Sequence, residues 1–383
     1  MVYVKRTFHP VGQGAFYTEV FYNEDRSRFI MVYDCGTETG EKNMEASLDD
    51  QIDLFKKRKL QISQIDILFI SHFHADHING LKRLLENVRV KKTVIPMLDE
   101  PAIIATRVHN HLRYSRGNAE AVDKVIEDLY YGGKGSERYG EIIVVGPDKK
   151  DEPQILEDGR VRAPMVKTRW YSGDRIPVNK YWEFIPFNSI KFNDPRTLDL
   201  ITRIDFHFGP NYNLDYLIKN YLSSLRDIYR KAMGSTNDNL YTLVVVSKPV
   251  DGVKPMPRPR LAHCIYMGDF DYRQSADPWE RLKVVINYDE IGMVQVPHHG
   301  AKGNWLSEMG DGKRRHYIVS SGTTNGYHHP NYWVLHEIMD KGHKVIVVSE
   351  KKASRKAYVF EVDYGKDKQG IERDTETENV TTE

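Results

Sequence analysis

Apolar residues along the chain recur in short runs, and most runs end in loops rich in glycine, histidine or asparagine. Residues 1–36 hold three such runs, "YVKRTFHPV", "AFYTEVFYN" and "RFIMVYDCG", whose alternation predicts a meander of three strands. Later runs predict further strands: "IDILFI", "KKTVIPML", "EIIVVGP", "YWEFIPFN", "NLYTLVVVSK", "LAHCIYMGDFD", "GMVQVP", "RRHYIVSS" and "HKVIVVSE". Polar loops that follow buried strands commonly carry functional groups, so we expect the chemistry of this protein in these loops.

Four stretches have apolar residues near helical spacing, and they cover residues 43–60, 77–88, 118–133 and 213–234. The last stretch, from Asn213 to Gly234, is the longest and predicts one amphipathic helix. Packing of its apolar face onto the core is the expected role, and the alternative is a lid or wall beside a substrate site. Strands and helices together predict a mixed α/β fold.

The composition is that of an ordinary globular protein, with 383 residues, 40% hydrophobic and 28% charged. The net charge of +1 gives no reason to expect nucleic acid or an anionic membrane as a partner, although a local basic groove is compatible with it. No apolar run approaches the ~20 residues of a transmembrane helix, and the N-terminus lacks a signal-peptide core. We therefore expect no membrane partner.

Two cysteines, Cys35 and Cys264, do not make a disulfide framework, so a reducing cytoplasm is the expected location. Residues 365–383 are polar and charged, which predicts a disordered tail after a single domain over residues 1–364.

The segment "FISHFHADHING" (Phe69–Gly80) places His72, His74, Asp76 and His77 within six positions, directly after a predicted buried strand. In an extended segment, side chains two residues apart point to the same side, so His72 and His74 can share a target. Asp76 and His77 follow after a turn and can aim at a neighbouring point. Imidazole nitrogens with carboxylate oxygens suit zinc, and also iron or manganese. One loop is therefore expected to supply ligands to two ions.

The motif "HFHADH" resembles the H-x-H-x-D-H signature of the metallo-β-lactamase fold hydrolases. The segment "HPVGQGAF" (His9–Phe16) is similar to the V-G-Q-G segment of ComEC-type members, the DNA-uptake subgroup. Four more segments resemble motifs of the family: "VYDCGTE" with Asp34 and Gly36, "YMGDFD" with Asp269, "VPHHGAKGN" with His298, His299 and Gly300, and "SSGTTNGYHHP" with Asn325, Tyr327 and His329. These matches occur in order from residue 9 to residue 330 and cover most of the chain.

The resemblance implies an α/β (α+β) fold, a four-layered αββα sandwich whose loops at one edge carry a dinuclear centre. It implies two divalent cations, with Zn²⁺ the first choice and Mn²⁺ the second. The implied metal ligands are His72, His74, Asp76, His77, Asp269, His298, His299 and His329. The implied catalytic residues are Asp76, His299, Lys302 and Asn325. Asp34 is expected to contact the metal ligands rather than the metal. Which of the adjacent His298 and His299 binds metal stays open.

The chain also departs from the usual family pattern. Members of the fold usually supply a further histidine before the bridging aspartate, and the candidates here are His109, His111, His207 and His263. His263 lies six residues before Asp269 in one predicted strand, which would place both on the same face. Residues 98–180 and 190–236 exceed a minimal domain and are predicted to be helical insertions that cover the site.

The resemblance implies hydrolysis by a metal-activated hydroxide. The first hypothesis is a nuclease or phosphodiesterase acting on DNA or a nucleotide, with nucleic acid as the partner and bacterial defence as an implied setting. The alternative is a hydrolase of a small ester, thioester or lactam on the same dinuclear site. A third reading is a scaffold without activity, which the nearly complete ligand set disfavours because packing does not need metal ligands.

Overall fold

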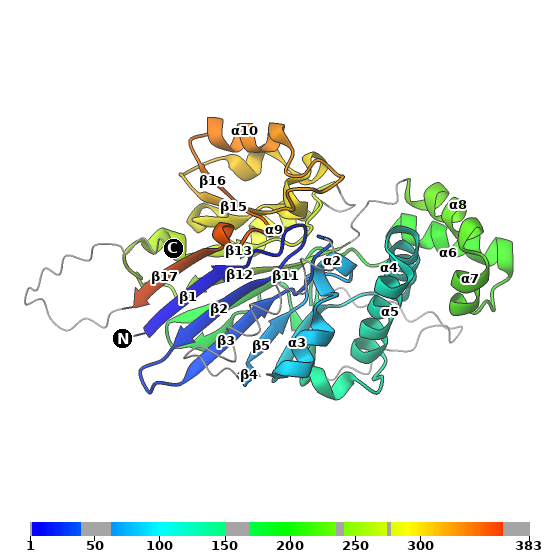
Figure 1. The fold of residues 1–383 in the computed structure, drawn as a ribbon, viewed down its shortest axis with the longest axis horizontal. Helices are drawn as coiled ribbons and strands as arrows, with labels where there is room; N and C mark the ends of the chain where they lie inside the picture. Colours follow the sequence, from blue (N-terminus) through cyan, green and yellow to red (C-terminus); the bar gives the residue numbers. More distant parts are fainter. Residues whose placement is uncertain (1, 40–62, 150–167, 235–240, 274–276, 363–383) are drawn as a thin grey trace, which may run out of the picture.

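The computed structural model describes residues 2–39, 63–149, 168–234, 241–273 and 277–362. Two large sheets face each other, and helices lie outside both of them (Figure 1). The predicted mixed fold with two facing sheets is therefore confirmed. Among the described residues, no helix has both the length and the apolar character needed to cross a bilayer.

The first sheet has eight strands, antiparallel at one side and parallel at the other. In spatial order they are β17 (Lys356–Val362), β1 (Val2–Phe8), β2 (Tyr17–Tyr22), β3 (Arg28–Tyr33), β5 (Ile67–Phe69), β7 (Lys92–Pro96), β8 (Glu141–Gly146) and β9 (Thr168–Tyr171). The strands from β17 to β3 pair antiparallel, and those from β3 to β9 pair parallel. Two short strands, β4 (Gln64–Ile65) and β6 (Arg89–Val90), pair separately beside it.

The second sheet has seven strands with the same division. In spatial order they are β10 (Ile176–Asn179), β11 (Trp182–Asn188), β12 (Leu243–Pro249), β13 (Cys264–Tyr266), β14 (Met293–Gln295), β15 (His316–Ser320) and β16 (Lys344–Val348). The strands from β10 to β13 pair antiparallel, and those from β13 to β16 pair parallel. Ligand sites in such sheets lie beyond the carboxyl ends of the parallel strands, so both sheets offer a site edge.

The α-helices form the outer layers and a lateral group (Figure 1). They are α2 (Ala75–Ile78), α3 (Leu81–Asn87), α4 (Glu100–Arg113), α5 (Arg116–Tyr130), α6 (Pro195–Phe208), α7 (Leu214–Asn220), α8 (Leu222–Met233), α9 (Pro278–Val285) and α10 (Tyr332–Asp340). Short 3₁₀ turns connect the strands of the second sheet, among them η4 (Pro297–Gly300) and η5 (Lys302–Asn304).

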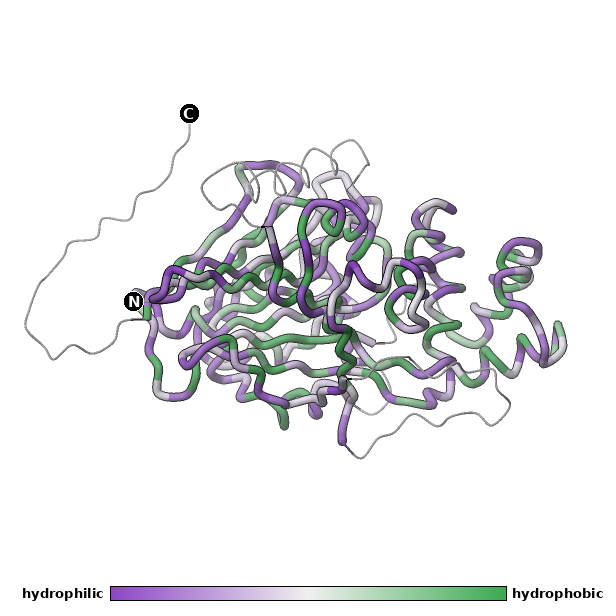
Figure 2. The backbone as a smooth tube through the Cα atoms, turned by 90° about the horizontal axis from the view of Figure 1, so that it is seen from below, coloured by the Kyte–Doolittle hydropathy of each residue, from purple (hydrophilic) through white to green (hydrophobic). Residues whose placement is uncertain are grey.

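Alternation along the strands divides the core into layers. In β3, Ile30 and Val32 pack outward with α3 and α5, whereas Met31 and Tyr33 pack between the sheets. A third apolar cluster joins the outer face of the second sheet to α9 and α10. Hydrophobic segments accordingly run along the strands in Figure 2, with hydrophilic segments interspersed at turns. Because successive side chains of a strand point to opposite faces, each sheet packs on the other sheet with one face and on helices with the other, which gives four layers.

Helices α6, α7 and α8 pack on α4 in a fourth apolar cluster, at one side of the sandwich (Figure 1). The prediction of one continuous helix over residues 213–234 is wrong, because Tyr221 leaves helical geometry at φ −131° and ψ 30°. The side-chain amide of Asn220 donates to the Tyr216 carbonyl at 2.8 Å, a bond that competes with the backbone ladder just before the break. The apolar face of α8 packs on neighbouring helices, as expected from the pattern.

A buried ion pair in the first sheet makes further hydrogen bonds to the second sheet. Arg6 of β1 donates from Nε to Oε1 of Glu19 in β2 at 2.6 Å, and both side chains are fully buried. Glu19 also accepts from Ser247 Oγ of β12 at 2.6 Å and from Tyr266 OH of β13 at 2.7 Å. Arg6 donates across the interface to the carbonyls of Leu261 and Ala262. Burial alone would lower the pKa of Arg6, but Glu19 raises it, so the guanidinium stays charged.

Most predicted elements are confirmed, including the N-terminal meander and every predicted strand named above. Strand β17 was not predicted, and its exposed and buried residues alternate against β1. The helix predicted over residues 43–60 and the tail over residues 365–383 lie outside the described residues.

Replacement of Glu19 by alanine is expected to lower the free energy of unfolding by about 3–5 kcal/mol, because Arg6 is left buried without its counterion. Urea unfolding followed by fluorescence measures this change. Asp199→Ala, which removes an exposed pair with Arg203, is the matched control and should change stability by about 0.5 kcal/mol or less. Equal midpoints for the two variants would contradict the assigned role.

Candidate metal centre

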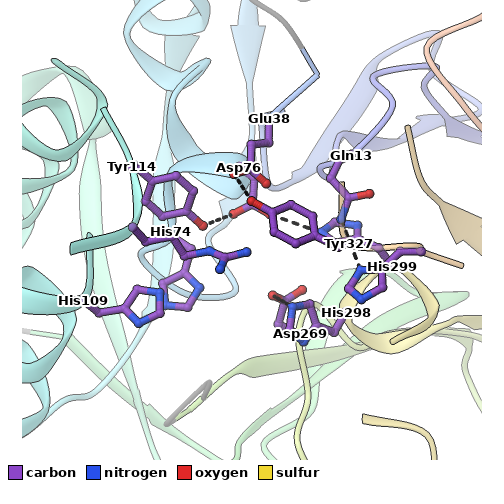
Figure 3. A pocket seen from close by; sticks show the side chains of 12 residues that line it. Gln13, Glu38, His74, Asp76, His109, Tyr114, Asp269, His298, His299 and Tyr327 are labelled. Carbon is purple, nitrogen blue, oxygen red and sulfur yellow. Dashed lines mark hydrogen bonds and ion pairs between the residues drawn. The ribbon is translucent and has the colours of Figure 1, made fainter. Parts of the chain in front are cut away.

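The carboxyl ends of parallel strands from both sheets surround one pocket (Figure 3). The loop after β5 supplies the histidine cluster, the loop after β13 supplies Asp269, and the turn after β14 supplies His298 and His299. The loop after β15 supplies His329. Residues more than 200 positions apart in sequence therefore meet at one point.

Asp34 organises the first-sheet half of the pocket. It follows β3 with a left-handed φ of 55° and accepts from both Ser71 N and Ser71 Oγ at 2.7 Å. Its Oδ2 also accepts from His77 Nδ1 at 2.8 Å. Because the Ser71 hydroxyl proton goes to Asp34, Ser71 Oγ accepts from His72 Nδ1 at 2.8 Å. One buried carboxylate thus orients both imidazoles.

The turn at residues 297–300 lets two adjacent histidines face the pocket together. His298 and His299 both have left-handed backbone angles, with φ of 48° and 55°. Gly300 continues at φ 80°, and a Cβ there would lie 2.8 Å from Pro330 Cβ, which requires glycine. His299 Nε2 lies 3.2 Å from Asp76 Oδ2, and His298 Nε2 lies 3.7 Å from Asp269 Oδ2. The two histidines therefore approach different carboxylates.

Four imidazoles of the pocket share one hydrogen-bonding pattern. His299 Nδ1 donates to the Ser320 carbonyl and His298 Nδ1 donates to Asn304 Oδ1, each at 2.9 Å. His72 and His77 use Nδ1 on Ser71 and Asp34. Each ring therefore presents Nε2 to the carboxylates, and fixing Nδ1 in this way is typical of histidine ligands.

The residues present fit divalent cations. Two groups offer ligand atoms within 4.8 Å of one another: His72, His77 and Asp269, and Asp76, His77 and His299. Nε2 of His72 and Nε2 of His77 are buried and make no hydrogen bond with the described residues. Burying a polar atom without a hydrogen bond costs free energy, and a bound cation would remove that cost. Imidazole nitrogens together with carboxylate oxygens suit zinc or manganese.

Negative charge dominates the electrostatics of the pocket. Burial would raise the pKa of Asp76, but His77 and His299 lower it below its usual range. Burial would likewise raise the pKa of Asp269, and His298, His77 and His72 lower it. Burial would lower the pKa of His77, but Asp269, Asp76 and Asp34 raise it well above its usual value. Three buried carboxylates around one imidazole make a site that attracts positive charge.

Comparison with known proteins gives one match to a family. The sequence model of the Metallo-beta-lactamase superfamily matches residues 25–164. This part of the chain, somewhat more than a third of its length, is therefore similar to metallo-β-lactamase superfamily domains. The match includes the histidine cluster and Asp34, which form the first-sheet half of the pocket. No curated protein sequence matches the chain.

Several solved structures resemble this chain at a distance. YhfI from Bacillus subtilis, a metallo-β-lactamase fold protein, is 12% identical with a TM-score of 0.37, over 93% of this chain and 99% of that chain. PDE1 from yeast is 11% identical with a TM-score of 0.40, over 94% and 99%. Zn²⁺-bound PqqB from Methylobacterium extorquens is 9% identical with a TM-score of 0.40, over 90% and 98%. Likenesses this distant identify no substrate.

The predicted metal ligands fall into two sets. His72, Asp76, His77, Asp269 and His299 make up the two close groups. His74, His298 and His329 line the same pocket but lie outside those groups. The ring of His74 stacks on His109, with centroids 4.3 Å apart and planes at 4°.

Of the four candidates for a further histidine, only His109 lines the pocket. His111 Nε2 lies 2.9 Å from Asp123 Oδ2. His207 lies on α6, where its ring contacts the ring of Phe208. His263 precedes β13 and lies 3.9 Å from Glu290, so the expectation that it shares a strand face with Asp269 is wrong. β13 ends at Tyr266, and a turn at Gly268 separates Asp269 from it.

Two predicted catalytic residues lie at the edge of the site rather than in it. Asn325 uses its amide within its own loop, where Nδ2 donates to the His329 carbonyl and Oδ1 accepts from the His329 amide. Its contacts orient His329. Lys302 is exposed, and its Nζ lies 5.3 Å from the Trp333 ring centre.

Sequence reasoning missed several pocket residues, namely Gln13, Glu38, Arg113 and Tyr114, and did not assign a role to Tyr327. Tyr114 OH donates to Asp76 Oδ1 at 3.0 Å, and Tyr327 OH donates to Glu38 Oε1 at 2.8 Å (Figure 3). Arg113 and Tyr114 stand at the end of α4, where no local motif marks them. Only the "GQG" turn around Gln13 offered a signal in the sequence.

His77→Ala is expected to abolish most cation binding, because His77 belongs to both groups of ligand atoms. Elemental analysis after zinc loading and dialysis measures the bound metal. His111→Ala is the matched control and should retain the wild-type metal content, since His111 pairs with Asp123 outside the pocket. Asp34→Asn should weaken metal affinity about 10- to 100-fold by disturbing the ring orientation of His77. Unchanged metal content in His77→Ala would overturn the assignment.

Proposed function

We propose that this protein is a metal-dependent phosphodiesterase that acts on nucleic acid or nucleotides. The observation that carries the proposal is the pattern of four imidazoles whose Nδ1 atoms are engaged and whose Nε2 atoms face two buried carboxylates. Packing alone needs no such arrangement. The similarity to metallo-β-lactamase superfamily domains supports hydrolysis as the reaction class.

His72, His77 and Asp269 would hold one cation, and Asp76 and His299 would contribute to a second, because only Nε2 of His77 is free to bind a cation. When bound, divalent cations supply Lewis acidity and make water nucleophilic at neutral pH. Asp76 and Asp269 both line the pocket, and Asp76 is the more exposed of the two, so it would be the carboxylate that accepts a proton there. Tyr114 OH donates to one of its oxygens and restricts its rotation.

His329 differs from the other pocket histidines, and we propose that it donates a hydrogen bond to the substrate. Gln13 Oε1 accepts from the Gly322 amide at 3.4 Å, so Gln13 Nε2 is the atom that donates to His329 Nδ1 at 3.4 Å. The proton of the neutral ring is then on Nε2. A ring with this tautomer suits hydrogen bonding to an oxygen of the substrate or leaving group better than metal binding.

Positive side chains favour a phosphodiester over an uncharged ester or lactam. Arg113 lines the pocket, and Lys302 stands directly after the histidine turn. Both are placed to attract an anionic substrate. The ComEC-type segment "HPVGQGAF" favours DNA as the polymer, and the buried, unpaired Cys35 and Cys264 fit a reducing cytoplasm.

Purified wild-type protein loaded with Zn²⁺ or Mn²⁺ is expected to hydrolyse bis(4-nitrophenyl) phosphate and at least one of single-stranded DNA, RNA or a cyclic nucleotide. Asp269→Asn should lower the rate about 100-fold or more, because a charge that holds cations is lost. His263→Ala, a half-buried histidine before β13, is the control and should retain activity. EDTA should abolish the activity, and added metal should restore it.

Hydrolysis of thioesters or lactams, with every phosphodiester left intact, would replace this proposal with the alternative substrate class. No turnover of any of these substrates by fully metal-loaded protein would favour the scaffold without activity.

His329→Ala is expected to lower kcat about 100-fold while leaving the metal content unchanged, because a hydrogen-bond donor to the substrate is lost and no metal ligand. Stopped-flow turnover and elemental analysis of the same sample separate the two roles. Loss of metal in proportion to activity would instead make His329 a ligand.

A further inference from the structure

Aromatic side chains at the mouth of the pocket are unusually open to solvent. Tyr327 is 39% exposed, Trp333 is 46% exposed and the neighbouring Tyr332 is 75% exposed. Single exposed apolar residues are common on protein surfaces, whereas a group of exposed rings next to a candidate active site is typical of a binding surface.

Tyr327 and Trp333 are fixed to the loops that carry the pocket histidines. Tyr327 precedes His329 by two residues, and Trp333 follows it by four. The Asn331 amide donates to the Gly300 carbonyl at 2.9 Å, which joins this loop to the His298–His299 turn. Asn331 Oδ1 then accepts from the Trp333 amide at 3.0 Å and caps α10. Trp333 is therefore held at a set position relative to the histidines.

Each of the two rings has a cation beside it. The Arg113 guanidinium carbon lies 4.6 Å from the Tyr327 ring centre, and Lys302 Nζ lies 5.3 Å from the Trp333 ring centre. Both distances are within the range of a cation–π contact. The Tyr327 ring is further held by the hydrogen bond from its hydroxyl to Glu38 (Figure 3). The pair of Tyr327 and Arg113 thus lines the pocket, and the pair of Trp333 and Lys302 lies on the segments that directly follow the pocket histidines His329 and His299.

We propose that these two pairs, Tyr327 with Arg113 and Trp333 with Lys302, bind unstacked bases and backbone phosphates of single-stranded nucleic acid on either side of the cleaved bond. The inference rests on the proposed function and narrows its substrate class. Bases stack on aromatic side chains in a sequence-tolerant way, and nearby cations follow the phosphate backbone.

Single strands fit this surface better than duplexes or small esters. In a duplex the bases stack on one another and are closed to a protein ring, whereas a single strand presents their faces. A small phosphodiester without a base would contact the cations and the pocket but gain nothing from Trp333. We therefore expect Trp333 to increase the affinity for substrates that contain bases, and not for substrates without bases.

The test compares Trp333→Leu with wild type on a fluorescein-labelled oligothymidylate of about ten nucleotides. Fluorescence anisotropy in the presence of EDTA measures affinity without cleavage, and the variant should bind about tenfold more weakly. With Mn²⁺, its KM for the oligonucleotide should rise by a similar factor, while its KM for an abasic strand of the same length stays at the wild-type value. Trp333→Phe retains a ring and should recover most of the affinity.

Tyr3→Leu is the matched control, because Tyr3 is also 39% exposed but lies near the start of β1. It should behave as wild type in both assays. Equal affinity of Trp333→Leu and wild type for the oligonucleotide, or equal losses for an abasic strand of the same length, would overturn the inference while leaving the phosphodiesterase proposal intact. Trp333-dependent binding in a protein that cleaves no phosphodiester would support the binding surface and refute the proposed function.

Discussion

The buried pair of Arg6 and Glu19 is the interaction on which the arrangement of the two sheets depends. Each charge would be strongly unfavourable between the sheets without the other, and their remaining hydrogen bonds reach across the interface to the second sheet, including Ser247 and Tyr266. These bonds are directional, so they set the position of one sheet against the other more narrowly than apolar packing does. The candidate metal centre requires this accuracy, because each group of ligand atoms takes residues from both sheets.

Local strain accumulates where the chain turns into the pocket. Asp34, His298 and His299 all have left-handed backbone angles that side chains rarely adopt. Such angles persist only where surrounding contacts enforce them, and here they direct a supporting carboxylate and two imidazoles inward. The same geometry explains how neighbouring histidines reach different carboxylates, because a run of left-handed residues reverses the chain tightly. Rigidity of this kind favours preorganised binding of cations over rearrangement on binding.

In the proposed function, the pocket binds the cations and the residues around it bind the substrate. Buried imidazoles and carboxylates supply a compact centre of negative charge, while Arg113, Lys302 and the exposed rings lie around its opening. Helix α4 connects these parts, since it ends at Arg113 and Tyr114 in the pocket and is buttressed by α6, α7 and α8. The lateral helices thereby support the position of Arg113 and Tyr114 through their packing on α4.

The positions of most strands along the chain and the histidine cluster at the end of β5 followed from the sequence alone, because strand periodicity and a four-ligand motif are local properties. A supporting role for Asp34 was also predicted, but the residues that Asp34 contacts were not. Only the tertiary structure decided that His109 reaches the pocket and His263 does not, since that depends on how α4 and β13 are placed. Tautomers, the contacts of Tyr114 and Gln13, and the break at Tyr221 likewise arise from contacts that no local pattern records. Hydrogen bonds between residues hundreds of positions apart form only once both sheets are packed, and they determine which side chains act together.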